Sequence, residues 1–111
     1  MSLDEDFVRL RHMLDAAAKV VQFTKGRTRS DLEKDEKLPF ALTRLLEIIG
    51  EAANQTSQEF RLKHPDLPWR SMTATRNRLI HGYFDVDLDV IWTISSQDIP
   101  SLMVHLKKIL E

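Results

Sequence analysis

The residues best suited to chemistry lie in one octet, Arg76–Tyr83, with the sequence RNRLIHGY. It places two arginines, an amide, a histidine and a tyrosine close together in the chain. Histidine titrates near neutral pH and can act as a general base or a general acid. Arginine supplies permanent, planar donors that suit phosphate oxygens. The octet therefore predicts phosphate binding combined with proton transfer.

These two abilities suit metal-independent cleavage of RNA. A general base would remove the proton of the ribose 2′-hydroxyl, and a general acid would protonate the leaving 5′-oxygen. We expect Arg76 and His81 in the catalytic roles, with Asn77 and Arg78 supporting them at the phosphate. One histidine cannot readily make both transfers at once. A symmetric dimer would bring two octets together and supply two histidines in one composite cleft.

The octet is expected at the end of a helix that runs from Trp69 to about His81. Asn77 and His81 are four residues apart and would lie on one face of that helix. Arg76 falls on the apolar, core-facing stripe, so it must find a partner or open onto a cleft. The helix dipole at this end would favour a protonated histidine.

The preceding long helix carries a polar stripe as well as an apolar one. Its members share a spacing that keeps them on one side: Glu47, Glu51, Asn54, Gln55 and Gln58. A solvated face is the ordinary interpretation of such a stripe. The sharper hypothesis is that Glu51 faces the octet and orients one of its arginines.

Each residue of the octet, taken singly, also has a structural explanation. A histidine before a glycine often ends a helix, and helical arginines mostly face solvent or pair with acids. Metal binding is not indicated, because His12, His64 and His105 show no ligand spacing with His81 and cysteine is absent. The sequence contains no glycine-rich phosphate loop and no G-x-S-x-G motif. We therefore expect neither a metal nor a cofactor.

Composition fits one soluble helical domain spanning residues 1–111. Hydrophobic residues make up 42% of the chain, enough for a packed core, and there are only three glycines and four prolines.

The net charge is −1, so no global positive field attracts nucleic acid. From Arg61 to Tyr83, however, five basic residues face one acid. This local patch suits a small phosphate-contacting site. Cysteine is absent, and no apolar run is long enough to span a bilayer. Both features fit a cytoplasmic protein without a membrane segment.

Hydrophobic periodicity predicts an all-α bundle of four main helices plus one or two short ones. The expected boundaries, in chain order, are Asp4–Phe23, a short turn after Ser30, a helix from about Leu38 to Phe60 or beyond, Trp69–His81, Leu88–Ser95 and a last helix capped by Asp98. Gly26 should end the first helix, and Asp87 should cap the helix from Leu88. Gly50 inside a helix indicates a close approach by another helix.

Three features give the chain a family resemblance. Arg76-x4-His81-x-Tyr83 matches the R-x4-H-x-Y signature of HEPN domains, in their HepT-like ribonuclease branch. The segment LEIIGEA at 46–52 is similar to that branch's second helix. The segments HPDLPW at 64–69 and DLDVIW at 87–92 are similar to its second half, in the same order.

The resemblance implies properties that spacing alone does not show. The fold would be the HEPN bundle, in a homodimer with the octet at the cleft between subunits. The activity would be that of an endoribonuclease toxin in a type VII-like toxin–antitoxin pair, with a minimal nucleotidyltransferase (the MntA-type antitoxin) as partner. That partner would attach AMP to Tyr83, and the added phosphate would compete with RNA for Arg76 and Arg78.

Two other interpretations remain open at this point. The chain could be a non-catalytic module that binds nucleotide or a nucleotidyltransferase partner through the octet. It could also be a plain helical dimerisation domain, which would leave the octet unexplained.

Overall fold

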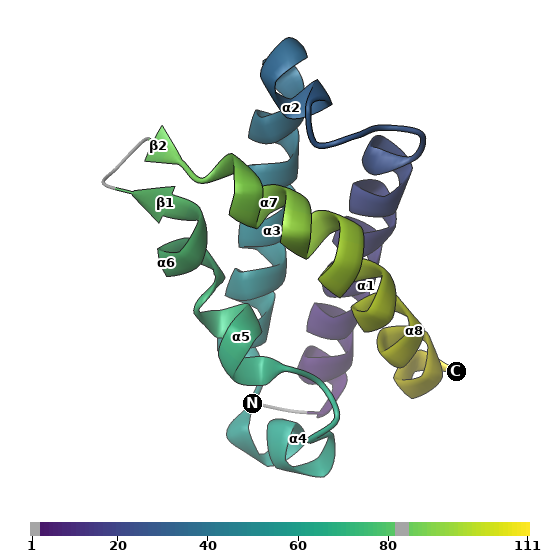
Figure 1. Ribbon diagram of the computed structural model, residues 1–111. Helices are drawn as coiled ribbons and strands as arrows, with labels where there is room; N and C mark the ends of the chain where they lie inside the picture. Colours follow the sequence, from purple (N-terminus) through teal and green to yellow (C-terminus); the bar gives the residue numbers. More distant parts are fainter. Residues whose placement is uncertain (1–2, 82–84) are drawn as a thin grey trace.

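Two long antiparallel helices form the base of the structure, a computed structural model that describes residues 3–81 and 85–111. They are α1 (Leu3–Thr24) and α3 (Lys37–Gln55), and the short α2 (Asp31–Lys34) lies between them in the chain. A third long element crosses both helices diagonally (Figure 1). The predicted all-α bundle is therefore confirmed.

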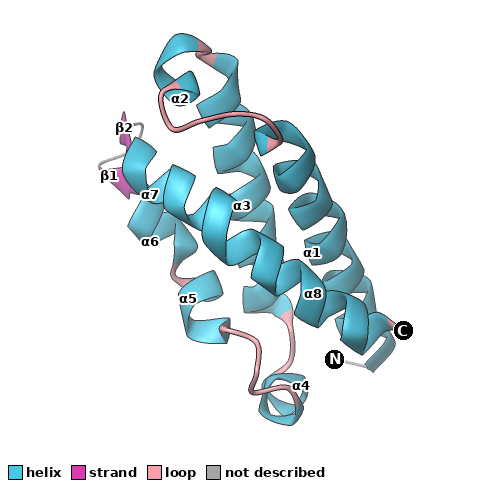
Figure 2. Ribbon diagram, turned by 45° about the vertical axis from the view of Figure 1, so that its right-hand side comes forward, coloured by secondary structure: helices cyan, strands magenta, loops and turns pink. Residues whose placement is uncertain are grey.

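The crossing element is one continuous rod built from three segments. It consists of α7 (Leu88–Thr93), the π-helix η1 (Ile94–Asp98) and α8 (Ile99–Leu110). Figure 2 shows the three segments running into one another without a loop. Leu102 and Leu106 of α8 and Ile91 of α7 are buried against the base helices. Burial of this apolar stripe is what holds the rod across the pair.

The remaining face carries short elements. These are α4 (Gln58–Lys63), α5 (Trp69–Thr73), α6 (Thr75–Leu79) and two antiparallel strands, β1 (Ile80–His81) and β2 (Asp85–Val86). Helices α5 and α6 pack on α3, beside the rod (Figure 1). The octet thus begins on a short helix and continues into a strand.

The two glycines in the described part of the chain behave as predicted. Gly26 has φ +73°, a left-handed conformation that ends α1. A Cβ placed on Gly50 would lie 2.9 Å from the carbonyl oxygen of Met72 and 3.5 Å from Cβ of Thr75. Gly50 therefore lets α5 and α6 approach the backbone of α3 closely, as its place inside a helix suggested.

The predicted extension of the second helix to Phe60 is wrong, because α3 ends at Gln55. Thr56 is extended, and Ser57 accepts a hydrogen bond from the backbone N–H of Phe60 to begin α4. The buried carboxylate of Asp6 accepts hydrogen bonds from the backbone N–H and the hydroxyl of Ser57, at 2.8 and 2.7 Å. The Asp6 carboxylate, which lies far away in the sequence, thus stabilises an interruption of the helix at a place where the sequence contains no helix-breaking residue.

The predicted single helix from Trp69 to His81 is also wrong. It breaks at Ala74 (φ −90°, ψ 2°) and ends at Leu79. The hydroxyls of Thr73 and Thr75 donate to the carbonyls of Arg70 and Ser71. Such side-chain bonds compete with the backbone N–H groups of a regular helix, so two threonines flanking Ala74 favour an interruption there.

Asp87 caps α7 as expected, accepting from the backbone N–H of Val90 at 3.1 Å. The predicted cap at Asp98 is wrong: its backbone is helical (φ −74°, ψ −41°) and its side chain makes no capping bond. The rod continues through Pro100 because the wide π-turn precedes it. A proline lacks the N–H of a normal turn and crowds the turn before it, and π-turns relieve both problems.

Candidate functional site

Helix α6 turns three polar residues of the octet outward. Thr75 and Leu79, four residues apart, are buried and anchor the helix. Arg76, Asn77 and Arg78 lie between them and are exposed. The prediction that Arg76 lies on a core-facing stripe is wrong, because the break at Ala74 changes which residues face inward. The three side chains instead form a surface that a charged ligand can reach directly.

This surface is cationic. Arg70 of α5 is also exposed, and neither α5 nor α6 contains an acidic residue. Arg76 has no ion pair and no hydrogen bond from its side chain to another described residue. A permanently charged guanidinium without a carboxylate partner is available to a phosphate group.

Arg76 borders a small pocket of about 210 Å³ on the outer side of α3. The rest of its polar lining consists of Glu47, Glu51, Asn54 and Thr73. Glu51 and Arg76 thus line the same pocket, but Oε1 of Glu51 is 3.7 Å from Nη1 of Arg44, so the carboxylate pairs with that arginine. Both partners of that contact are exposed, so it stabilises little and leaves the carboxylate able to change partner.

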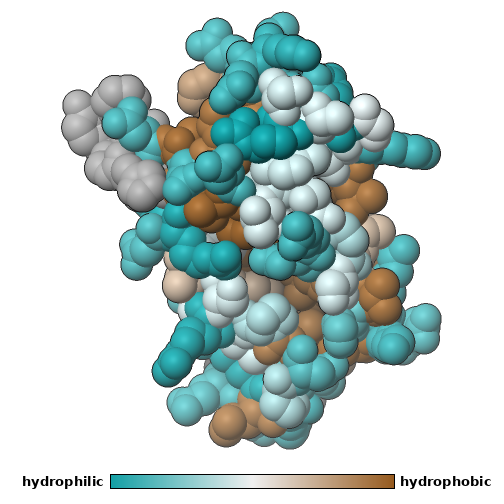
Figure 3. All heavy atoms as spheres, viewed as in Figure 1, coloured by the Kyte–Doolittle hydropathy of each residue, from teal (hydrophilic) through white to brown (hydrophobic). Residues whose placement is uncertain are grey.

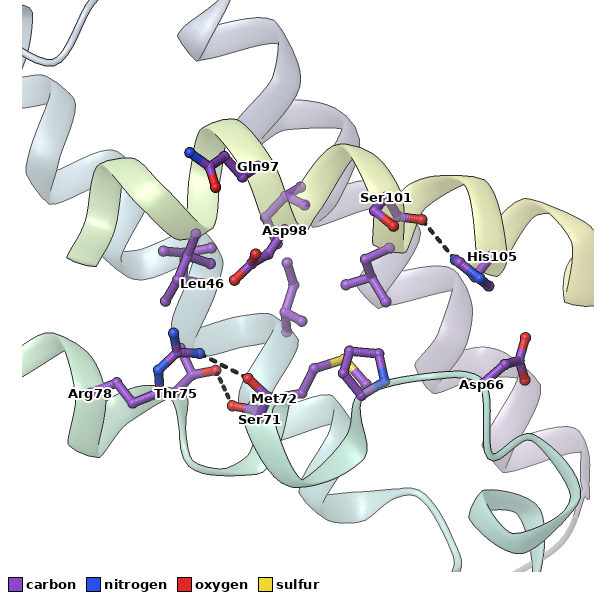
Figure 4. A pocket seen from close by; sticks show the side chains of 15 residues that line it. Leu46, Asp66, Ser71, Met72, Thr75, Arg78, Gln97, Asp98, Ser101 and His105 are labelled. Carbon is purple, nitrogen blue, oxygen red and sulfur yellow. Dashed lines mark hydrogen bonds between the residues drawn. The ribbon is translucent and has the colours of Figure 1, made fainter. Parts of the chain in front are cut away.

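Arg78 points to the other side of α6. Its Nη1 donates a hydrogen bond of 2.8 Å to the hydroxyl of Ser71. It borders a larger pocket, about 350 Å³, between α5–α6 and the rod (Figure 4). The two arginines of the octet therefore line two different pockets, which lie on opposite sides of the short helix α6.

His81 lies in β1, two residues beyond the end of α6. Its Cα pairs with that of Asp85 in the antiparallel ladder, and the backbone N–H of Asp87 donates to the carbonyl of Leu79 at 2.7 Å. The predicted stacking of Asn77 and His81 on one helical face is wrong, because the two residues belong to different elements. Tyr83, the expected modification site, lies outside the described residues.

Within residues 3–81 and 85–111, no three histidine, aspartate or glutamate side chains lie together in a way that would hold a metal ion. No helix in the same part of the chain has the length and apolar character needed to cross a bilayer.

Sequence reasoning missed the residues that complete the larger pocket. Ser71, Gln97 and Asp98 line it together with Arg78. Asp98 was assigned to a helix cap because an aspartate two residues before a proline is typical of a helix start. No local signal in the sequence indicates the π-turn that carries Gln97 and Asp98 to the pocket.

Comparison with known proteins adds three findings. The family model described as "Ribonuclease HepT-like" matches residues 13–109. A protein of Thermococcus cleftensis named "Probable ribonuclease HepT" is 40% identical over 100 residues, covering 90% of this chain and 91% of that protein. A relative from Methanocaldococcus jannaschii, classed as an RNase by its name, is 38% identical and covers 84% of this chain and 85% of its own length. Another, from Caldanaerobacter subterraneus and also named as an RNase, is 39% identical over 92% of this chain and 91% of its own. No solved structure gives a significant match.

Proposed function

The chain belongs to the HepT-like ribonuclease family, and on that premise we propose that it is a metal-independent endoribonuclease. The reaction would be attack of a ribose 2′-hydroxyl on the adjacent phosphate, with departure of the 5′-oxygen. Atoms balance without a cofactor, because one proton leaves the 2′-oxygen and one is added to the leaving oxygen.

The observation that carries the proposal is the outward display of Arg76, Asn77 and Arg78 on α6. Arg76 is exposed and unpaired among the described residues, so it can bind a phosphate without first breaking an ion pair. In the reaction its guanidinium would stabilise the charge that develops on the phosphorane oxygens. Asn77 would hold a neighbouring phosphate, Arg78 would bind the RNA on the other side of α6, and Glu51 would exchange Arg44 for Arg76 and orient it.

His81 would move the protons, and a homodimer would supply the second histidine. The backbone of His81 belongs to the β1–β2 ladder, which directly follows α6 in the chain. Two copies facing each other across a symmetry axis would form one cleft with both a general base and a general acid.

Cleavage of a labelled RNA in the presence of EDTA tests the reaction. We expect His81→Ala and Arg76→Ala to lower the rate by about a hundredfold or more. The matched controls are His12→Ala and Arg11→Ala, exposed residues of the same types on α1, which should retain the wild-type rate. Equal cleavage by wild type and His81→Ala, or cleavage only with added metal, would contradict the mechanism.

We further propose that the protein is the toxin of a toxin–antitoxin pair. Its partner would be a minimal nucleotidyltransferase of the MntA type that attaches AMP to Tyr83. This step rests on the family resemblance and on the proximity of Tyr83 to Arg76 and Arg78 in sequence, because added phosphate would compete with RNA for those cations.

Co-expression with such a nucleotidyltransferase, followed by intact-mass measurement, tests this pairing. The expected result is a gain of AMP units in the wild type that Tyr83→Phe lacks, together with loss of RNA cleavage. Modification without any cleavage by the unmodified protein would instead support a non-catalytic binding module. Gel filtration would test the dimer, since a monomer at assay concentration contradicts the composite cleft.

A further inference from the structure

The larger pocket has the form of a small-ligand site. It holds about 350 Å³, at the lower end of the range found for ligand pockets. Its floor is apolar and comes from three layers of the fold: Leu46, Ile49, Met72, Ile99 and Leu102. Figure 3 shows hydrophobic residues on this side of the molecule in small groups between hydrophilic ones, so an occupant would meet polar surface around the mouth.

The rim carries hydrogen-bonding groups of opposite character on facing walls. Arg78 of α6 and Asp98 of η1 both point into the mouth, from the two sides of the pocket (Figure 4). The Asp98 carboxylate makes no hydrogen bond or ion pair with any other described residue. Arg78 uses one nitrogen on the Ser71 hydroxyl and keeps its other donors. At the mouth of the pocket, the N–H donors of the Arg78 guanidinium therefore lie opposite the two acceptor oxygens of the Asp98 carboxylate.

The π-turn gives this rim its shape. Gln97 and Asp98 belong to η1, the one five-residue segment of the rod where the helix widens. Turns of this kind recur at functional sites because they redirect side chains that a regular helix would point elsewhere. Here the turn places an acidic side chain, unused as a cap, over an apolar floor.

We propose that this pocket binds a guanine base of the RNA substrate, beside the phosphate held by Arg76. The inference rests on the proposed ribonuclease function and adds its base preference. Guanine has two acceptors on one edge, O6 and N7, and two donors on the next, N1–H and N2–H. The first pair suits the Arg78 fork, and the second suits the two oxygens of Asp98.

The other bases fit this arrangement less well. Adenine presents a donor beside its N7, which opposes an arginine fork. The pyrimidines lack the N7 acceptor, so Arg78 would lose one of its two bonds. An apolar side chain from a second copy would fill the floor but leave Arg78 and Asp98 buried without partners, which is costly. Arg76 and Arg78 extend to opposite sides of the short helix α6, so an RNA strand that crosses α6 would place a base in the pocket and a phosphate at Arg76.

Calorimetric titration with the four nucleoside 3′-monophosphates tests the pocket without requiring catalysis. We expect 3′-GMP to bind roughly tenfold or more tightly than the other three. Asp98→Asn should abolish this preference, because it replaces one acceptor oxygen with a donor. Asp15→Asn, an exposed aspartate on α1 away from the pocket, should keep it. Equal binding of all four nucleotides by the wild type would overturn the proposal.

Sequencing of the ends produced from an RNA of mixed sequence separates this inference from the proposed function. A preference for guanine beside the cut, lost in Asp98→Asn and kept in Asp15→Asn, supports the pocket. No cleavage by the wild type together with selective 3′-GMP binding would refute the ribonuclease and leave the guanine site standing. Cleavage without base preference would refute the site alone. If Ser101→Trp, at the mouth, dissociates a dimer without changing nucleotide binding, the pocket is a contact between copies and the inference fails.

Discussion

Replacing Gly50 with alanine should lower both the stability of the protein and its RNA cleavage. The added Cβ would lie 2.9 Å from the carbonyl oxygen of Met72, closer than carbon and oxygen atoms pack, and 3.5 Å from Cβ of Thr75. The oxygen belongs to the backbone of α5, so it cannot rotate away as the end of a side chain would. Helices α5 and α6 must move away from α3, and α6 carries Arg76.

Two opposing contributions set the magnitude. Alanine is a better helix former than glycine by about 1 kcal/mol, which would stabilise α3. Overpacking against a fixed neighbour costs about 1–3 kcal/mol. The net expectation is a loss of about 1 kcal/mol in the free energy of unfolding, which corresponds to a fall of about 4 °C in Tm for a domain of this size. Because small displacements of catalytic groups are costly, kcat/KM for RNA cleavage should fall about tenfold.

Urea denaturation and RNA cleavage, measured on the same preparations, check both parts. Gly26→Ala is the matched control. Its Cβ would meet nothing within 4 Å, but φ is +73°, so alanine there costs about 1 kcal/mol through backbone strain. Both variants should lose similar stability, whereas only Gly50→Ala should lose activity.

Two results would refute this reasoning. If Gly50→Ala were more stable than the wild type and equally active, the gain in helix propensity would exceed the cost of overpacking. The inferred close approach of α5 to α3 would then be incorrect. If both variants lost activity equally, the loss would reflect stability and not the position of Arg76.

Three further predictions concern the contacts that hold the short elements. Arg61→Ala should lower the free energy of unfolding by about 2 kcal/mol in urea denaturation, because the guanidinium donates to three carbonyls at the end of α3; an unchanged midpoint would contradict this. Asp6→Ala should cost about 2–3 kcal/mol by the same measurement, since it strips the two hydrogen bonds from Ser57, and accelerated amide exchange in α4 should accompany the loss. The backbone N–H of Thr28 lowers the pKa of Asp31. A lowered carboxyl pKa adds stability above its unfolded value, about 3.9, and that stability is lost as pH falls through the folded pKa. The stability difference between wild type and Asp31→Asn should therefore be seen near neutral pH and vanish in acid, and a pH-independent difference would be inconsistent with this assignment.

Much of the fold could be predicted because its signals are local and repeated. The apolar stripe of α1, the glycine that ends it and the Asp87 cap each depend on a few neighbouring residues, and all three appear as expected. Gly50 was also informative. Glycine weakens a helix, so its presence inside α3 indicated a position where a Cβ would collide with a neighbouring element.

The errors occurred where distant residues compete for the same backbone groups. Asp6 stabilises the break at Ser57 from 51 positions away in the chain, which no helical pattern reveals. Asp98 has the local features of a cap, yet the π-turn that contains it lets the rod stay helical through Pro100 and pack across the base helices. Local propensities are small, so burial of a whole helix overrides them.

Residue types and their spacing are enough to identify the groups available for chemistry and the family to which the chain belongs. Arg76, Arg78 and His81 could be named from residue type and spacing, because phosphate binding and proton transfer require those side chains wherever they lie. The directions in which Arg76 and Arg78 point depend on the tertiary structure. The break at Ala74 turns Arg76 away from the core, and the π-turn brings Asp98 opposite Arg78. The directions of Arg76 and Asp98 both depend on how α3, α6 and the rod pack in one core. That packing forms only when the whole chain folds, so no single segment of the sequence reveals it.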